Sequence, residues 1–169
     1  MPWQTDASIG DWFYRKPDTY PSATHFIHVL ADIVSKNGKM LLNIPPRPDG
    51  TLDPRAVKTL KAIGAWLRVN GEAIYGTHPW KQAVEDHARF TSKGDVLHVI
   101  LLKRPGRKVE LRFPGSGALG ERIENVIDVS SGKAVMHEQL QDHLVIHTPM
   151  LAIIKTRYRT TRSHEAIKH

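Results

Sequence analysis

The sequence of 169 residues contains no cysteine, and this absence removes several classes of chemistry. Without thiols there is no disulfide framework, no thiolate zinc site and no cysteine nucleophile. Long apolar runs are also lacking, since no stretch approaches the roughly 20 residues that a helix needs to cross a bilayer. The N-terminal stretch MPWQTDASIGDW lacks the basic and apolar segments of a secretory signal. The sequence therefore predicts no membrane partner, and it leaves the cellular localisation unknown.

Acidic residues are fewer than basic ones, 17 against 24, which gives a net charge of +7 with histidine neutral. A basic balance permits binding to nucleic acid. The positive charges are spread along the chain, however, and are densest in LKRPGRK (102–108) and KTRYRTTR (155–162). We interpret these clusters as a solvated loop and a frayed tail, so no nucleic-acid partner is predicted. Hydrophobic residues make up 40% of the chain, which is enough for a packed core.

The first 71 residues have the pattern loop, helix, strand, helix. Residues 1–20 mix aromatic side chains with glycine and proline, which predicts an irregular loop. A helix with an apolar stripe is predicted after the N-cap Ser22, and a second one after the cap Asp53. The run KMLLNI (39–44) between them is apolar on both faces, which is typical of a parallel strand covered by helices. No second strand to pair with it is evident nearby, so its partners must come from elsewhere in the chain or be absent.

After Trp80 the pattern changes to short strand-like runs separated by turn signals. Six or seven strands at this spacing predict an antiparallel β-sandwich. We therefore expect domains over residues 1–80 and 81–157, followed by a disordered basic tail over 158–169.

The ten histidines raise the question of a metal site. His25 and His28 lie at helical spacing, and His143 and His147 lie on one strand-like run. Neither pair has an acidic residue at a ligand spacing such as H-E-x-x-H, so no metal site is predicted. The glycine-rich GSGALG (115–120) is not followed by a helix pattern, which indicates a loop between strands and not a phosphate site.

An aromatic cluster near the N-terminus is the candidate binding site. Trp3, Trp12 and Phe13 lie among polar residues, and aromatic faces beside hydrogen-bonding groups suit sugar recognition. Core packing is the alternative role for these rings. Asp6 and Asp11 are candidates for the paired carboxylates of glycoside chemistry, although aspartates in loops more often form turns or caps.

Three ordered motifs resemble the last part of the catalytic domain of α-L-fucosidases, glycoside hydrolase family 29. They are PWQTDASIGDWFYR (2–15), VSKNGKMLLNIPPRPDG (34–50) and IGAWLRVNGEAIYGTHPW (63–80). FTSKGDVLHVILL (90–102) also resembles the start of that family's C-terminal β-sandwich. The resemblance implies an α+β fragment in which the last helix–strand–helix portion of a (β/α) barrel precedes an antiparallel β-sandwich. It further implies a retaining hydrolase of terminal α-L-fucosyl linkages, a fucosylated glycan or fucoside as substrate, and no cofactor.

Two departures from the family pattern predict that this chain alone is inactive. The family's aspartate nucleophile lies upstream of the tryptophan-led loop at which this chain starts. Many relatives also carry Trp-Glu in this loop, where the glutamate is a candidate acid/base. Gln4 stands there in this chain and cannot deliver a proton, which leaves Asp6 as a weak substitute. A partial barrel with open sheet edges also predicts self-association. The alternative function is a non-catalytic carbohydrate-binding module.

Overall fold

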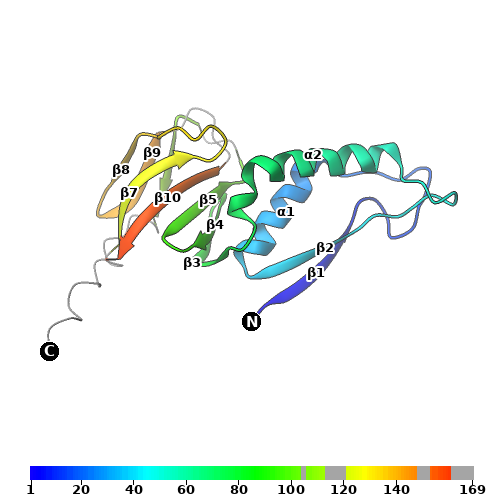
Figure 1. Ribbon diagram of the computed structural model, residues 1–169, viewed down its shortest axis with the longest axis horizontal. Coiled ribbons are helices and arrows are strands. Elements are labelled where there is room, and N and C mark those ends of the chain that lie inside the picture. The colour runs from blue at the N-terminus through cyan, green and yellow to red at the C-terminus, as the bar shows by residue number, and fades with distance from the viewer. Residues whose placement is uncertain (104–105, 113–120, 148–152, 161–169) are drawn as a thin grey trace.

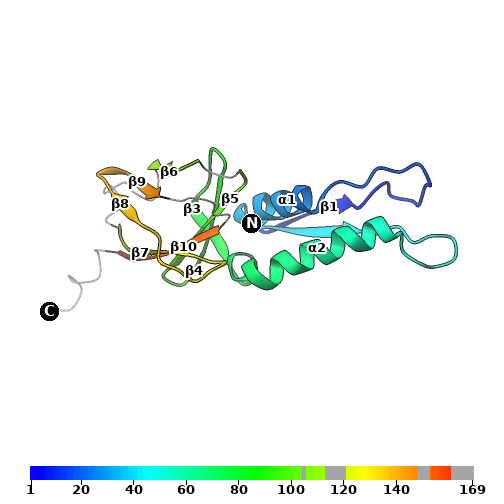
Figure 2. The same ribbon diagram turned by 90° about the horizontal axis from the view of Figure 1, so that it is seen from above.

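A computed structural model of the chain describes residues 1–103, 106–112, 121–147 and 153–160. An α/β part lies at one end of an elongated molecule, and a set of antiparallel strands lies at the other (Figure 1, Figure 2). The elements in chain order are β1 (Trp3–Ser8), α1 (Ala23–Ser35), β2 (Gly38–Asn43), α2 (Pro54–Asn70), the 3-10 helix η1 (Gly71–Ala73), β3 (His78–Glu85), β4 (Ala88–Lys93), β5 (Val96–Leu101), β6 (Lys108–Leu111), β7 (Glu121–Asp128), β8 (His137–Gln139), β9 (Asp142–His147) and β10 (Ile153–Thr160). No helix within these described ranges is long and apolar enough to cross a membrane.

Both predicted helices are confirmed, together with their caps. Ser22 Oγ accepts a hydrogen bond from the backbone N–H of His25 at the start of α1. The chain leaves α1 through Asn37, which has the left-handed φ of 67° that ends many helices. Asp53 caps α2, and Pro54 occupies its first position, where a missing N–H does no harm.

The expectation of an irregular loop over residues 1–20 is wrong for residues 3–8, which form β1. This strand pairs with β2 in parallel, from Trp3 opposite Gly38 to Ser8 opposite Asn43. The strand over KMLLNI is thus confirmed as parallel, and its partner is the segment at the N-terminus. Pairing across 35 residues supplies the backbone hydrogen bonds that neither strand has alone.

The β1–β2 sheet has one face covered by helices and one face open to solvent. Both helices lie on the same side of the two strands (Figure 1). Leu42 packs there with Phe26 of α1 and Ile63 of α2. On the other face Leu41 is 48% exposed, so the expected cover on both faces of this strand is absent from the described part of the chain.

The predicted antiparallel sheets follow in the second half of the chain. One sheet has the order β3-β4-β5-β10-β7 and the other β6-β9-β8, with every pairing antiparallel. The two sheets share one core, in which Phe90 and Val99 of the larger sheet pack with Leu144 and Ile146 of the smaller one. Two layers that bury their facing side chains in this way form a β-sandwich.

Two features of this region differ from the sequence-based expectation. Strand β3 was not predicted, and it lies at the edge of its sheet, where Pro79 removes no needed ladder hydrogen bond. Strand β10 continues through Thr160, beyond the predicted start of the tail at residue 158. The rest of that tail, 161–169, and the GSGALG segment lie outside the described residues.

The α/β part and the sandwich are joined through a second core. Ala31 of α1, Ala73 of η1, Ile100 of β5 and Ile153 of β10 are all buried in it. Polar contacts flank this core: Arg89 of β4 forms an ion pair with Asp32 of α1. Thr91 Oγ1, which is fully buried, donates to the Ala73 carbonyl at 2.8 Å.

Candidate functional site

The carboxyl ends of β1 and β2 meet at Ser8 and Asn43, which are opposite each other in the register. The Asn43 Nδ2 group donates to Ser8 Oγ at 2.9 Å and to the Trp12 carbonyl at 3.3 Å. Ser8 Oγ in turn donates to the Asp11 carbonyl at 2.9 Å. The end of the strand pair therefore fixes the backbone of the loop that carries Trp12.

The loop after β1 is held by its own carboxylates. The backbone N–H of Asp11 donates to Asp18 Oδ2 at 2.6 Å. The carboxylate of Asp11 accepts from the N–H of Trp12 at 2.7 Å and pairs with Arg15 at 3.0 Å. Gly10 has a φ of +92°, and a Cβ atom at this position would lie only 2.5 Å from Asp18 Oδ2, so the turn requires glycine here. Asp11 and Asp18 therefore act as turn formers, which leaves Trp12 on an ordered loop.

Trp12 and Phe13 project from this loop into solvent, with exposed fractions of 53% and 78%. Exposed aromatic side chains on an ordered loop suit stacking on the apolar face of a sugar. Within the described residues, neither ring is buried in a core, so the alternative role of core packing is not supported for Trp12 and Phe13.

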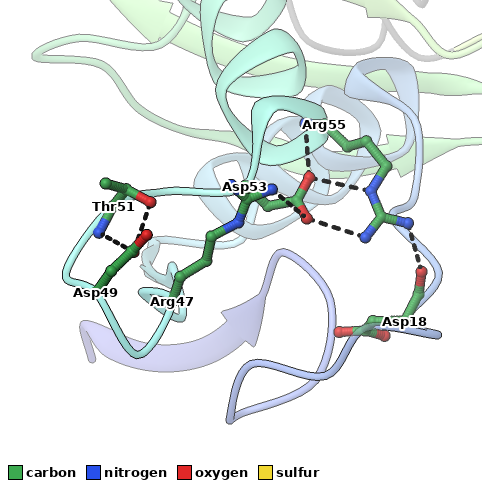
Figure 3. A network of polar contacts seen from close by, with 6 residues as sticks. All are labelled: Asp18, Arg47, Asp49, Thr51, Asp53 and Arg55. Atoms are coloured by element: carbon green, nitrogen blue, oxygen red, sulfur yellow. Dashed lines mark hydrogen bonds and ion pairs between the residues drawn. The ribbon is translucent and has the colours of Figure 1, made fainter.

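A network of arginines and carboxylates anchors the same loop to the start of α2 (Figure 3). Asp53 accepts from the backbone N–H and from the guanidinium of Arg55, and Arg47 contributes a longer contact of 3.5 Å. Arg55 also donates to the Asp18 carbonyl at 3.1 Å and lies over the Tyr20 ring at 4.4 Å. Hydrogen bonds from Arg55 hold the pKa of Asp53 well below its usual range; the bond from the guanidinium has the larger effect and the bond from the backbone N–H the smaller.

Replacing Asp53 by alanine is expected to lower the melting temperature by several degrees at neutral pH, because α2 loses its cap and Arg55 its partner. The pKa of Asp53 is depressed in the folded state, so its contribution is full above the unfolded pKa of about 4 and is lost as the pH falls below that value. The difference between wild type and Asp53→Ala, followed by thermal melts in acid, should therefore shrink.

The Asp53→Asn variant serves as the matched control, because asparagine still caps a helix but carries no charge. At neutral pH we expect its melting temperature to lie between those of wild type and Asp53→Ala. In acid it should lose less stability than wild type does. Equal acid sensitivity of wild type and Asp53→Asn would contradict this role for the Asp53 carboxylate.

The structure separates the sequence-predicted site residues into two groups. Gln4 and Asp6 lie on the open face of β1, where Gln4 Nε2 donates to Asp6 Oδ1 at 3.3 Å. Trp3 lies on the opposite face, and its indole N–H donates to the Lys36 carbonyl at 2.9 Å. All three are on the strand itself, whereas Trp12 and Phe13 follow its carboxyl end. The sequence-based grouping of Trp3 with Trp12 is thus not reproduced.

Sequence reasoning missed Ser8 and Asn43, which position the loop. The available signal was Asn43 itself, a polar residue within the run KMLLNI and near the carboxyl end of the predicted parallel strand. The candidate histidines are not brought together into a metal site. His143 and His147 contact Asp142 and Glu138, respectively. Within the described ranges, no group of three or more His, Asp or Glu residues is arranged to hold a metal ion.

Comparisons with known proteins agree on one family. The α-L-fucosidase family model matches residues 1–72, which contain β1, α1, β2 and α2. The tissue α-L-fucosidase of Homo sapiens is 32% identical over 142 residues, which are 79% of this chain and 28% of the human protein. The chain therefore spans little more than a quarter of the length of this curated relative.

Solved structures of α-L-fucosidases share the fold of both parts. Isoenzyme 1 from Paenibacillus thiaminolyticus gives a TM-score of 0.83 at 26% identity, over 94% of this chain and 40% of that one. Thermotoga maritima α-fucosidase, in complex with fucose, gives 0.79 at 29% identity, over 92% of this chain and 39% of that one. Because the family model, the human relative and the solved structures all agree, the chain belongs to the α-L-fucosidases of glycoside hydrolase family 29.

Proposed function

We propose that this chain is the C-terminal part of a retaining α-L-fucosidase that hydrolyses terminal α-L-fucosyl linkages in glycans or fucosides. The observation that carries the proposal is the position of Trp12 and Phe13. They are exposed on a loop fixed at the carboxyl ends of two parallel strands, within the segment that the family model matches. The Thermotoga maritima relative, whose structure contains fucose, supports this substrate class.

We further propose that residues 1–80 complete a (β/α) barrel and that residues 81–157 form its C-terminal sandwich. The order β1, α1, β2, α2 with parallel strands is the repeating unit of such barrels. Barrel enzymes place their active sites at the carboxyl ends of the strands, which is where Trp12 lies. The open face of β1–β2 and its unpaired edges favour self-association of the chain in isolation.

We also propose roles for individual residues near this loop. Gln4 occupies the position of the family's candidate acid/base, and its amide hydrogen-bonds to Asp6. A glutamine donates a hydrogen bond to a glycosidic oxygen but no proton. Asp6 is the adjacent carboxyl group, on the same strand face. We assign Trp3, Trp12 and Phe13 to fucoside binding, with Trp12 and Phe13 favoured by their exposure.

We expect the purified 169-residue chain to release no chromophore from an aryl α-L-fucoside above the uncatalysed rate. A retaining mechanism needs a nucleophile and an acid/base carboxyl group about 5 Å apart across the bond. Next to Trp12, the carboxylates of Asp11 and Asp18 are both engaged in holding the loop. The assay is continuous absorbance, with Thermotoga maritima α-fucosidase as the positive control. Turnover well above background would show that the chain carries both catalytic carboxyl groups.

A non-catalytic carbohydrate-binding module is the second candidate, and the exposure of Trp12 favours it. Under this hypothesis, millimolar L-fucose changes the tryptophan fluorescence of the chain in a saturable way. Trp12→Ala should abolish that change, because the stacking ring is removed. The control is Tyr75→Ala, which removes a ring that is 59% exposed next to the sandwich. No change with fucose or a fucosylated oligosaccharide argues against binding by this chain.

A further inference from the structure

A cavity of about 460 Å³ opens on the outer face of the larger sheet of the sandwich. Its walls come from β4, β5, β7 and β10, and from η1 at the end of the α/β part. The residues that carry the argument are Glu72, Lys93, His98, Asn125, Lys155 and Arg157. None of them belongs to the site described above, and the inference does not rest on the proposed function.

The strand register places the polar residues of this cavity side by side. Lys155 of β10 is opposite His98 of β5 on one side and Ile127 of β7 on the other. Arg157, two residues further along β10, is opposite Asn125 of β7. Residues that are directly opposite in an antiparallel pair share one face of the sheet, so these side chains all point away from the sandwich core.

Positive charge exceeds negative charge among the groups that line the cavity. Lys93, Lys155 and Arg157 are cationic, and Glu72 is anionic. Glu72 is bound to Lys155 at 2.9 Å. Among the described residues, the ion pair of Arg157 is a long contact of 4.0 Å with Asp95, which is itself largely exposed. The cationic groups are thus incompletely neutralised.

The burial of His98 without a hydrogen-bond partner among the described residues is a second, independent observation. The His98 side chain is only 2% exposed, and within the described residues neither ring nitrogen has a hydrogen-bond partner. A buried polar group without a hydrogen-bond partner destabilises the folded state, so native proteins normally supply a partner. Burial lowers the pKa of His98, with Glu72 opposing this effect and Lys155 and Lys93 adding to it.

We propose that this cavity binds a ligand with an oxyanion group, either a sulfate or phosphate ester or a carboxylate. Lys155, Lys93 and Arg157 supply the positive charge, and a ring N–H of His98 donates a hydrogen bond to the anion. The volume accommodates more than the anion alone and is in the range of small-molecule sites. Among the described lining residues there is no Phe, Tyr or Trp side chain on which a neutral sugar would stack.

The test is an NMR titration of the histidine rings of the 169-residue chain with assigned resonances. Sodium sulfate, inorganic phosphate, glucuronate and uncharged glucose are added separately, at an ionic strength held constant with chloride. We expect saturable shifts of the His98 ring signals with an oxyanion at millimolar concentration and none with glucose. A bound anion stabilises the imidazolium, so it should also raise the pKa of His98. Preference for sulfate, phosphate or glucuronate then identifies the source of the oxyanion.

Two substitutions give the test a matched control. Lys155→Met removes a cation from the cavity and should weaken binding by about tenfold, as expected for a charge-assisted contact. Lys58→Met removes an exposed lysine on α2, far along the chain from the cavity, and should leave the affinity unchanged. If no oxyanion shifts His98, if glucose shifts it equally, or if both variants weaken binding to the same extent, the proposal is overturned.

Discussion

Replacing Phe90 by alanine is expected to lower the free energy of unfolding by about 3–5 kcal/mol, the range seen when a large core ring is truncated. Phe90 is 0% exposed and packs between the two sheets of the sandwich. Phe90 is directly opposite Val99 on the neighbouring strand. Because the strand pairing holds both backbones in place, the cavity left by the truncated ring cannot easily close. Urea denaturation followed by circular dichroism measures the change, and the melting temperature should fall by roughly 10 °C.

Phe13→Ala is the control for this prediction, because it removes the same ring from a side chain that is 78% exposed. Its effect on stability should stay within about 0.5 kcal/mol. A Phe90→Ala protein that unfolds at the same urea concentration as Phe13→Ala would show that the two sheets do not share the core described here.

The second large effect is expected for Gly38→Ala in β2. A Cβ atom at this position would lie 2.7 Å from Cζ2 of Trp3 and 2.7 Å from Cγ2 of Ile33. Both side chains must shift, and overpacking of this kind costs about 1–3 kcal/mol. Because the Trp3 ring lies on the backbone of Gly38, its displacement should also change the tryptophan emission spectrum.

Gly106→Ala provides the comparison, since no atom of the described residues lies within 4 Å of a Cβ atom at that glycine. The free energy of unfolding of this variant should stay within about 0.5 kcal/mol of the wild-type value, and its tryptophan emission spectrum should be unchanged. Unchanged stability of Gly38→Ala would mean that the Trp3 ring does not cover β2.

Local signals made the helices predictable from the sequence. Ser22, Asn37 and the Asp53-Pro54 pair act through hydrogen bonds and backbone angles within a few residues of themselves. Alternating apolar residues likewise located most strands of the sandwich, because each strand buries one face in a shared core.

Strand β1 escaped prediction because it depends on a distant partner. WQTDAS has no apolar run, and it is a strand because β2 pairs with it across 35 residues of sequence. Strand β3 contains Pro79 and an irregular register, which an edge position tolerates but a sequence pattern does not reveal.

The candidate site was predicted only in part for the same reason. Trp12 and Phe13 were proposed from the sequence as aromatic side chains near polar groups, and their exposure keeps them as candidates for binding. Trp3 was grouped with them because it is near in sequence. Strand geometry separates it, since β1 extends for about 16 Å between Trp3 and Ser8 and successive side chains alternate between its faces. The polar contacts of Asn43 depend on the pairing of the two strands and have no sequence signature of their own.

The core shared by the α/β part and the sandwich has a consequence for how the molecule opens. Ala31 of α1 is buried against Ile100 and Ile153 of the larger sheet, so α1 cannot expose its apolar side without uncovering that sheet. The backbone amides in the middle of α1 and of β5 should therefore exchange with deuterium through the same opening event, at similar rates. The β1–β2 ladder takes no part in this core and should exchange faster, as a separate and less stable unit of the same chain.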